Sequence, residues 1–296
     1  MIPTLFSISY AGLWGQERLD LRSFIKKAAE LGYSAVELVG KRPHLSILDT
    51  GPEDLAVLRD TAEAAGVEIA TIAGYTDFTG GRAAEVPFVE MQVAYVEALA
   101  KLGKALDAKV IRVFTGYSTD DESYQADWDK CVAAIRECSQ VAEHYGLVIG
   151  VQNHHDTAAA CDAYAEFLSE VDHPNCRAMF DSWSPALHGD DLYECAKTMA
   201  PLMVQTTLAD YVRLKRFRYM PGLVNYRELP EMVRAVPLGD GFIDLNAFFA
   251  GLHDGGFDGY VAYEMCSPLR GGGSMGNLDE TAARSLRKIK ELIGQA

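Results

Sequence analysis

Eight short apolar segments recur along the chain, and amphipathic stretches separate them. Stretches such as LRSFIKKAAELG and WDKCVAAIRECSQVAEHYG place apolar residues at i, i+3, i+4 and i+7, which is the periodicity of a helix. This strand and helix alternation favours a parallel sheet with helices on its outside. We expect the strands at residues 5–9, 35–39, 68–73, 110–115, 147–152, 177–180, 203–207 and 260–264.

Eight such units in 296 residues fit an α/β fold of the (β/α)8 TIM barrel type, with eight parallel strands. Gly32, Gly66 and Gly146 each stand between an expected helix and the next strand, where a left-handed residue ends a helix. The competing fold is an open doubly wound sheet, which usually carries a glycine-rich phosphate loop after its first strand. SYAGLWGQE is not such a loop. No linker or repeat divides the chain, so we expect one domain over residues 1–296.

The charge of the chain limits its partners. With 27 basic and 42 acidic residues, its formal charge is −15, which repels nucleic acid and anionic membranes. No window approaches 18 consecutive apolar residues, and the first residues lack the pattern of a secretory signal. The six cysteines form no CxxC pair, which is typical of reduced thiols. We therefore expect a soluble, cytoplasmic protein that binds neither nucleic acid nor membrane.

Two long connections, 74–93 and 210–240, are expected to be loops without regular structure. Loops of that length in a barrel usually act as lids or binding loops. The second contains Arg213, Lys215, Arg216 and Arg218 within six positions. This basic cluster suits an anionic substrate, although a solvated loop or a contact between subunits is the commoner explanation.

Polar residues end four of the predicted strands, and the carboxyl ends of barrel strands are where active sites lie. They are Gln152, Asp181, Gln205 and Glu264. Side chains alternate along a strand, so His154 shares a face with Gln152. Four oxygen donors are therefore expected to converge at the mouth of the barrel.

The chain resembles the sugar isomerase and epimerase superfamily with xylose-isomerase-like barrels. The matching phrases are GYSAVEL, QNHHD, FDSWSPALHG and GGFDGYVAYE, and they occur in the family's order over nearly the whole chain. The resemblance implies one divalent metal held by Gln152, Asp181, Gln205 and Glu264. Two of these depart from the family, since it usually has Glu at the first position and His at the third. Amide oxygens still suit Mn²⁺ or Mg²⁺, so a metal site remains possible beside a degenerate, metal-free network.

The family's chemistry is removal of a proton next to a sugar carbonyl, which gives an enediolate. Glu264 is the expected base. Gln152 cannot act as a second base, and His154, which titrates near neutrality in its free form, is the expected acid, with His155 or His188 as substitutes. Reprotonation of the enediolate gives isomerisation or epimerisation, whereas loss of a β-substituent gives elimination.

Several further residues are candidates for contacts with the substrate. Glu37 and Arg112 suit either substrate binding or an ion pair with each other inside the barrel. His44 lies in KRPHLS, where binding and a plain surface turn are equally expected. Trp183 suits stacking on a sugar face or ordinary packing. Cys266 is expected to be a packing thiol. The candidates for substrate contact are Glu37, His44, Arg112, His155, Trp183 and His188.

The first hypothesis for the function is therefore a metal-dependent sugar isomerase or epimerase with a small carbohydrate substrate. The alternatives are a keto-sugar lyase or hydratase at the same site, a barrel related to the endonucleases of abasic-site repair, and a sugar-binding subunit without catalysis. The acidic charge and the seven histidines fit the endonuclease poorly. The resemblance also implies a possible homo-oligomer.

Overall fold

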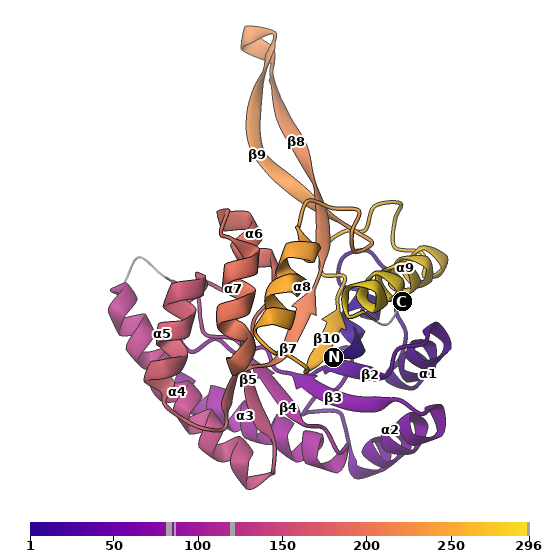
Figure 1. Cartoon of the computed structure of the whole chain (residues 1–296), viewed down its shortest axis with the longest axis vertical. Helices are drawn as coiled ribbons and strands as arrows, with labels where there is room; N and C mark the ends of the chain where they lie inside the picture. Colours follow the sequence, from indigo (N-terminus) through magenta and orange to yellow (C-terminus); the bar gives the residue numbers. More distant parts are fainter. Residues whose placement is uncertain (81–84, 86, 119–121, 295–296) are drawn as a thin grey trace.

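The computed structural model describes residues 1–80, 85, 87–118 and 122–294, and within them eight parallel strands close into a barrel (Figure 1). The first strand pairs with the second on one side and with the last on the other, so the prediction of a barrel is confirmed and the open sheet is excluded. Around the barrel the strands follow the order β1-β10-β7-β6-β5-β4-β3-β2. They are β1 (Ile2–Phe6), β2 (Ala35–Val39), β3 (Glu68–Ala73), β4 (Val110–Val113), β5 (Val148–Gln152), β6 (Cys176–Met179), β7 (Met203–Leu208) and β10 (Tyr260–Tyr263).

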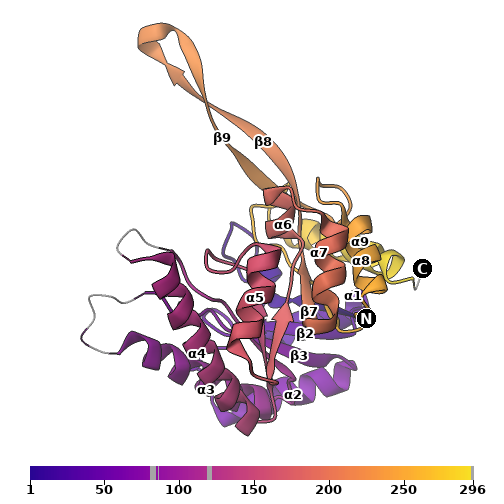
Figure 2. The same ribbon diagram turned by 60° about the vertical axis from the view of Figure 1, so that its left-hand side comes forward.

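Helices surround the barrel, and most of them contribute several buried apolar side chains to its core (Figures 1 and 2). They are α1 (Leu21–Leu31), α2 (Pro52–Ala65), α3 (Phe88–Ala105), α4 (Tyr124–His144), α5 (Cys161–Val171), α6 (Trp183–His188), α7 (Leu192–Met199), α8 (Leu245–Asp254) and α9 (Met275–Leu292). Gly32, Gly66 and Gly146 have φ values of 90°, 66° and 72°, which confirms that a left-handed glycine follows three of these helices.

The first strand begins and ends earlier than the sequence suggests. The sequence predicts a strand over 5–9, whereas β1 ends at Phe6 and a 3-10 turn, η1 (Ser7–Tyr10), follows. Two serine hydroxyls replace the missing ladder bonds: Ser7 Oγ accepts from the Val39 amide, and Ser9 Oγ accepts from the Met265 amide, both at 2.9 Å. These side chains satisfy backbone groups at the mouth of the barrel, where the chain turns away.

The connection 210–240 contains a hairpin, so the prediction of a structureless loop is wrong for most of it. β8 (Asp210–Met220) and β9 (Asn225–Val236) pair antiparallel around the short turn η3 (Pro221–Leu223). Their Tyr, Phe and Val side chains favour strands, and pairing satisfies the backbone groups that a loop would leave to water. We call residues 210–236 the arm, which projects far from the barrel in both ribbon views (Figures 1 and 2).

The connection 74–93 is only partly irregular, because α3 begins at Phe88. Residues 81–84 and 86 of this connection lie outside the described residues. In the part that is described, no helix is both long and apolar enough to cross a membrane. The six cysteines carry free thiols, and Cys131, Cys138 and Cys195 are buried.

Candidate active site

A cavity of about 500 Å³ opens at the carboxyl ends of the barrel strands. Much of its wall is aromatic, and several of these side chains lie at or just after a strand end. Phe6 closes β1, Tyr75 follows β3 and Phe114 follows β4. The aromatic lining consists of Phe6, Trp14, Tyr75, Phe114, Tyr117, Trp183 and Tyr211. Such a cavity can hold a small ring-shaped molecule by stacking and water exclusion.

Most of the predicted site residues lie in this lining, where a few polar groups interrupt the aromatic wall. The predicted residues that line it are Arg112, Gln152, His154, His155, Trp183 and Glu264. Glu37, Asp181 and Gln205 are buried and do not line it. Glu37 pairs with Arg112 and Asp181 accepts from Gln152, which both line it, while Gln205 donates to Glu37. The barrel thus gathers nine of the predicted residues at one end.

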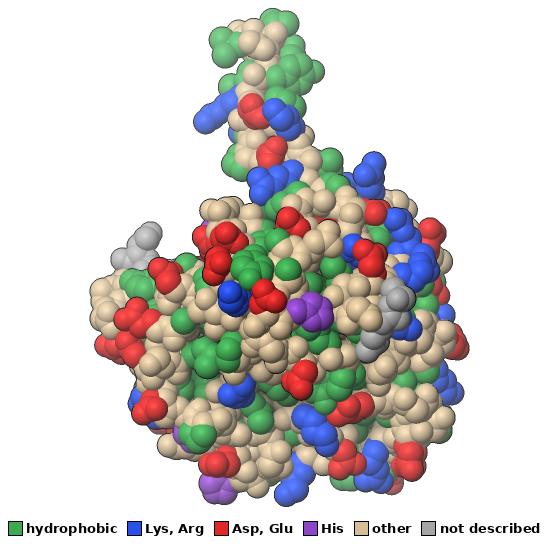
Figure 3. Space-filling model, in the orientation of Figure 1, with side chains coloured by type: hydrophobic (Ala, Val, Ile, Leu, Met, Phe, Trp, Pro, Cys, Tyr) green, Lys and Arg blue, Asp and Glu red, His purple; other side chains and the backbone are tan. Residues whose placement is uncertain are grey.

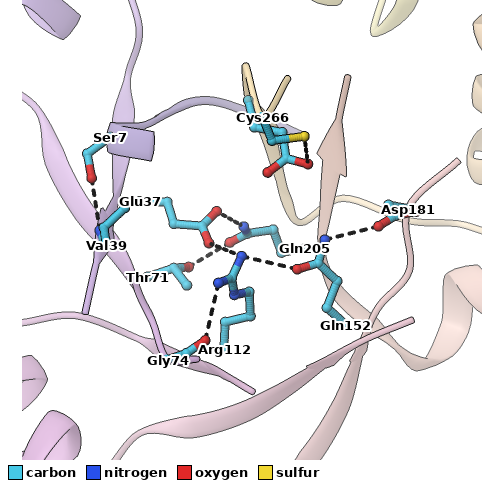
Figure 4. Close-up of polar contacts among 11 residues, drawn as sticks. Ser7, Glu37, Val39, Thr71, Gly74, Arg112, Gln152, Asp181, Gln205 and Cys266 are labelled. Carbon is cyan, nitrogen blue, oxygen red and sulfur yellow. Dashed lines mark hydrogen bonds and ion pairs between the residues drawn. The ribbon is translucent and has the colours of Figure 1, made fainter. Parts of the chain in front are cut away.

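Two glutamine side chains connect the buried layer (Figure 4). The Thr71 hydroxyl donates to Gln205 Oε1, and Gln205 Nε2 donates to Glu37 Oε2, each at 2.6 Å. On the other side of the barrel, Gln152 Nε2 donates to Asp181 Oδ2 at 3.0 Å. Each amide group therefore directs its N–H toward a carboxylate.

Arg112 is a buried cation at the centre of this network. Its Nη1 donates to Gln152 Oε1 at 3.1 Å and its Nη2 to the Gly74 carbonyl at 3.2 Å. The distance from Nη1 to Glu37 Oε1 is 3.8 Å, so these two side chains form the ion pair that the sequence left as one of two alternatives. The guanidinium carbon lies 4.7 Å from the centre of the Tyr75 ring and 4.3 Å from that of Phe114. These contacts hold one positive charge at the floor of the cavity.

The predicted metal ligands do not fit a metal in this arrangement. A ligating glutamine must offer its oxygen, but Gln152 Oε1 accepts from Arg112, and Gln205 Oε1 accepts from Thr71. The partners fix these orientations, because a guanidinium only donates and a carboxylate only accepts. Among the described residues, no group of three His, Cys, Asp or Glu side chains is placed to hold an ion either. We therefore derive no step through a metal.

Burial raises the pKa of the three carboxyl groups in this network. For Glu264 it raises the pKa to about 7, which the Arg112 charge opposes and the Glu37 charge supports. Burial also raises the pKa of Glu37 to about 7, against the effects of Arg112 and Gln205. Asp181 behaves in the same way, with burial raising its pKa to about 7 against the hydrogen bond from Gln152. A carboxyl group in this range can both take and return a proton near neutral pH.

The two adjacent histidines at the end of β5 differ from expectation. Desolvation at the cavity wall and the Arg112 charge lower the pKa of His154 to about 4, so its neutral ring predominates at neutral pH. The expectation that it titrates near neutrality is therefore wrong. His154 Nδ1 accepts from the His155 amide at 2.8 Å, which leaves Nε2 to carry the proton. His155 has a φ of 72°, an uncommon conformation that this contact stabilises.

The structure does not bring two predicted residues to the cavity. His44 is buried, with Nδ1 3.1 Å from Ser7 Oγ and Nε2 3.1 Å from the Leu19 carbonyl, and it stacks on Phe24. Burial lowers the pKa of His44 to about 4. His188 is exposed in the last turn of α6 and is not part of the cavity lining. Neither side chain therefore lines the cavity.

Sequence reasoning missed or underrated several lining residues. Cys266 lines the cavity and contacts Tyr211, with 2.7 Å between its sulfur and the hydroxyl oxygen, and its sulfur is 3.4 Å from Glu264 Oε1. Lys41 lines it as well, with Nζ 3.5 Å from the centre of the Tyr75 ring. Tyr75 and Phe114 follow the ends of β3 and β4, so their positions in the sequence already indicate that they lie at the mouth of the barrel.

The fold and the placement of this site define a TIM barrel with a polar and aromatic cavity at the strand ends. Residues 25–292 match the family described as xylose isomerase-like TIM barrel, and the chain belongs to this family.

Relatives with described activities are distant in sequence. A 3-dehydroshikimate dehydratase from Bacillus anthracis is 23% identical over 239 residues, which are 73% of this chain and 82% of that protein. A D-psicose 3-epimerase from Clostridium cellulolyticum H10, solved with D-tagatose, has a TM-score of 0.76 at 17% identity, with 99% of both chains covered. A probable 3-DHS dehydratase from Bacillus anthracis has a TM-score of 0.71 at 19% identity, covering 98% of this chain and 99% of that one. At such identities the solved structures support the fold alone.

Proposed function

We propose that this chain is an enzyme that removes a proton next to the carbonyl of a small carbohydrate or a carbohydrate-like ring, and that it then eliminates a β-hydroxyl group as water. The observation that carries this proposal is that Glu264 is the one carboxylate among the described residues that line the cavity. It stands at the end of β10, opposite the aromatic wall, with Arg112 in the same lining.

Glu264 is suited to both proton transfers of an elimination. As a carboxylate it takes the proton from the carbon, and the negative charge that develops on the carbonyl oxygen is stabilised by the fixed charge of Arg112. As a carboxylic acid it then returns the same proton to the leaving hydroxyl group. The carbon–hydrogen and carbon–oxygen bonds break, a carbon–carbon double bond forms, and water leaves. No second carboxylate is needed.

The aromatic lining and the neutral imidazoles support the same outcome. A flat conjugated product stacks well on rings such as Trp183 and Tyr75. His154 is a neutral N–H donor for a substrate oxygen. The dehydratase among the relatives catalyses a reaction of this class, as its name states.

Isomerisation is the second candidate function, and it remains compatible with a single base. A carboxylate that takes a proton from one carbon can return it to the neighbouring carbon on the same face. Epimerisation between two matched bases is less well supported, because Gln152 stands where a second carboxylate would be needed. The epimerases among the solved structures share the barrel with this chain.

The experiment is to incubate the protein in D₂O with 3-dehydroshikimate, D-psicose and D-fructose, and to identify the products by mass spectrometry and NMR. We expect loss of water from a β-hydroxy ketone, and the Glu264→Gln variant should be slower by at least about a hundredfold. Glu68→Gln is the matched control, because Glu68 begins β3 at the other end of the barrel. A product that keeps its oxygen atoms and has exchanged a carbon-bound hydrogen for deuterium would favour the isomerase, and full activity of Glu264→Gln would contradict both candidates.

The charges of the cavity favour a substrate that also carries an anionic group. Its charged lining residues are Lys41, Arg112 and Glu264, so basic groups outnumber the acidic one although the whole chain is acidic. Within the described part of the chain, Lys41 Nζ contacts the Tyr75 ring and has no carboxylate partner. Burial lowers its pKa, and a bound anion would offset that desolvation.

Lys41→Met should therefore raise KM for a carboxylated substrate by about tenfold and change kcat little, because binding at a distance from the reacting carbon is lost. Neutral ketoses should show no such change. Lys104→Met, an exposed residue in the last turn of α3, is the matched control. An equal effect of Lys41→Met on charged and neutral substrates would contradict the anionic group.

A further inference from the structure

Only the base of the arm, where Tyr211 and Val233 line the cavity, takes part in the proposed site, and the rest of the arm is the largest feature that the reaction does not use. From Arg213 to Met232 its two strands pair only with each other in the described structure. An isolated two-stranded hairpin is marginally stable in water, and its outer edges are open to pairing or packing. An arm of this length is therefore expected to rest on a surface that this single chain does not supply.

The two faces of the arm have different chemistry. Side chains alternate along each strand, and the register pairs Phe217 with Glu228 and Tyr219 with Tyr226. The aromatic face thus holds Phe217, Tyr219 and Tyr226, with the Tyr219 and Tyr226 rings 5.3 Å apart. Together with Leu214 and the tip residues Leu223 and Val224, these side chains are between 39% and 79% exposed. Large apolar side chains that are this exposed and this close together indicate a protein contact.

The opposite face of the arm is basic and lacks acidic partners. Arg218 and Arg227 stand directly opposite each other, and Arg216 is two residues along the same face. Like charges at such a pair destabilise a hairpin. None of these three guanidinium groups has a carboxylate partner in the described part of the chain, where the one ion pair of the arm joins Lys215 to Glu228. An acidic partner surface would remove this repulsion.

The rest of the chain has the complementary charge. The arm contains six basic and three acidic residues, a formal charge of +3, which leaves −18 of the total of −15 for the rest of the chain. Figure 3 shows basic side chains along the arm and many acidic side chains on the body below it. In a pair of copies, the basic arm of each chain can therefore contact the acidic body of the other. Such a reciprocal contact closes with two-fold symmetry.

We propose that two copies of this chain form a dimer in which the arm of each clasps the acidic body of the other. Two-stranded ribbons twist strongly, and the arm is visibly twisted (Figure 2), so a curved partner surface can contact both its aromatic face and its basic face. Opposite charges steer the two copies together, and the aromatic side chains and the tip bury apolar area. An anionic membrane is a poorer partner, because the charge of the body repels it.

Sedimentation velocity and light scattering over a wide range of protein concentration test this dimer. The wild type should be a dimer, and Arg216→Glu/Arg218→Glu/Arg227→Glu should raise the dissociation constant by on the order of a hundredfold. The matched control is Arg59→Glu/Lys104→Glu/Lys109→Glu, which makes the same charge change at exposed positions away from the arm and should stay dimeric. Phe217→Ser/Tyr226→Ser should also be monomeric, and circular dichroism should show an intact barrel in every variant.

Three results would overturn the proposal. They are a wild type that stays monomeric at all concentrations, a dimer that survives the arginine reversal, and a control triple variant that dissociates as readily. Binding of the wild-type arm to vesicles of anionic phospholipid, with no dimer in solution, would assign the arm to a membrane instead.

Discussion

The mouth of the barrel and the arm meet at the end of strand β7, yet different interactions stabilise them. At the mouth, every strand is paired on both sides, and buried polar side chains from distant parts of the sequence bond one another. Along the arm, two neighbouring strands bond only each other and most side chains face water. A polar group removed from the first region leaves buried partners unsatisfied, whereas one removed from the second leaves groups that water can satisfy.

This difference predicts where substitutions act. Changes at the mouth should affect both the free energy of unfolding and the reaction, because the same side chains form the floor of the cavity and the core of the network. Changes in the arm should affect association and leave both the barrel and its chemistry intact. The predictions below test this separation, beginning with the largest effect.

Arg112→Met should give the largest loss of stability. Removing the guanidinium leaves the buried Glu37 carboxylate without its cationic partner, and the Gln152 amide oxygen and the Gly74 carbonyl without their Arg112 donor. Removal of one member of a buried ion pair costs roughly 3–5 kcal/mol of unfolding free energy. Urea denaturation followed by circular dichroism measures this difference.

The control for Arg112→Met is Arg59→Met, since Arg59 is half exposed in α2 and should change stability by less than about 0.5 kcal/mol. A second control tests whether the unpaired charge causes the loss of stability. Glu37→Gln/Arg112→Met removes both charges and should be more stable than Arg112→Met alone. A double variant that is less stable than the single one would show that volume rather than charge explains the loss.

The sequence allowed the barrel to be predicted because its signals are local and repeated. Each strand is a short apolar run, and each helix that ends in Gly32, Gly66 or Gly146 has its own stop signal. The strand ends then located Gln152, His154 and Glu264 at the cavity, since a closed parallel barrel brings those ends together.

The orientation of side chains could not be predicted in this way. Whether a glutamine offers its oxygen or its N–H to the centre depends on partners such as Arg112 and Thr71, which lie on other strands. The sequence therefore could not show that Gln152 and Gln205 direct their oxygens to Arg112 and Thr71. The position of His44 could not be predicted for a related reason. A histidine in a loop can face the cavity or pack against a helix such as α1, and the three-dimensional path of residues 40–46 decides between the two.

A smaller effect on the free energy of unfolding is expected from a change of pH. This effect arises in the barrel, because the arm contains no histidine. Burial holds the pKa of His44 at about 4, below its value of about 6.5 in an unfolded chain. The stability that His44 contributes is therefore complete above pH 6.5 and falls as the pH is lowered toward 4, by up to about 3 kcal/mol. The difference in unfolding free energy between wild type and His44→Gln should shrink by this amount between pH 7.5 and pH 4. An imidazole that NMR shows to take up its proton above pH 6 would contradict the burial argument.

The smallest effect is expected from removing the arm. Replacing residues 214–231 with a short glycine turn deletes strands that bond only each other, so the barrel should lose less than about 0.5 kcal/mol. The comparison must be made between monomers, because a dimer gains apparent stability with protein concentration. The reference is therefore the arginine-reversal variant rather than the wild type. Chemical denaturation of the two proteins should give the same free energy of unfolding and the same rate with substrate, since Tyr211, which lines the cavity, remains in place. A truncated protein that is several kcal/mol less stable would mean that the arm packs on its own barrel, and the distinction between the two regions would then be wrong.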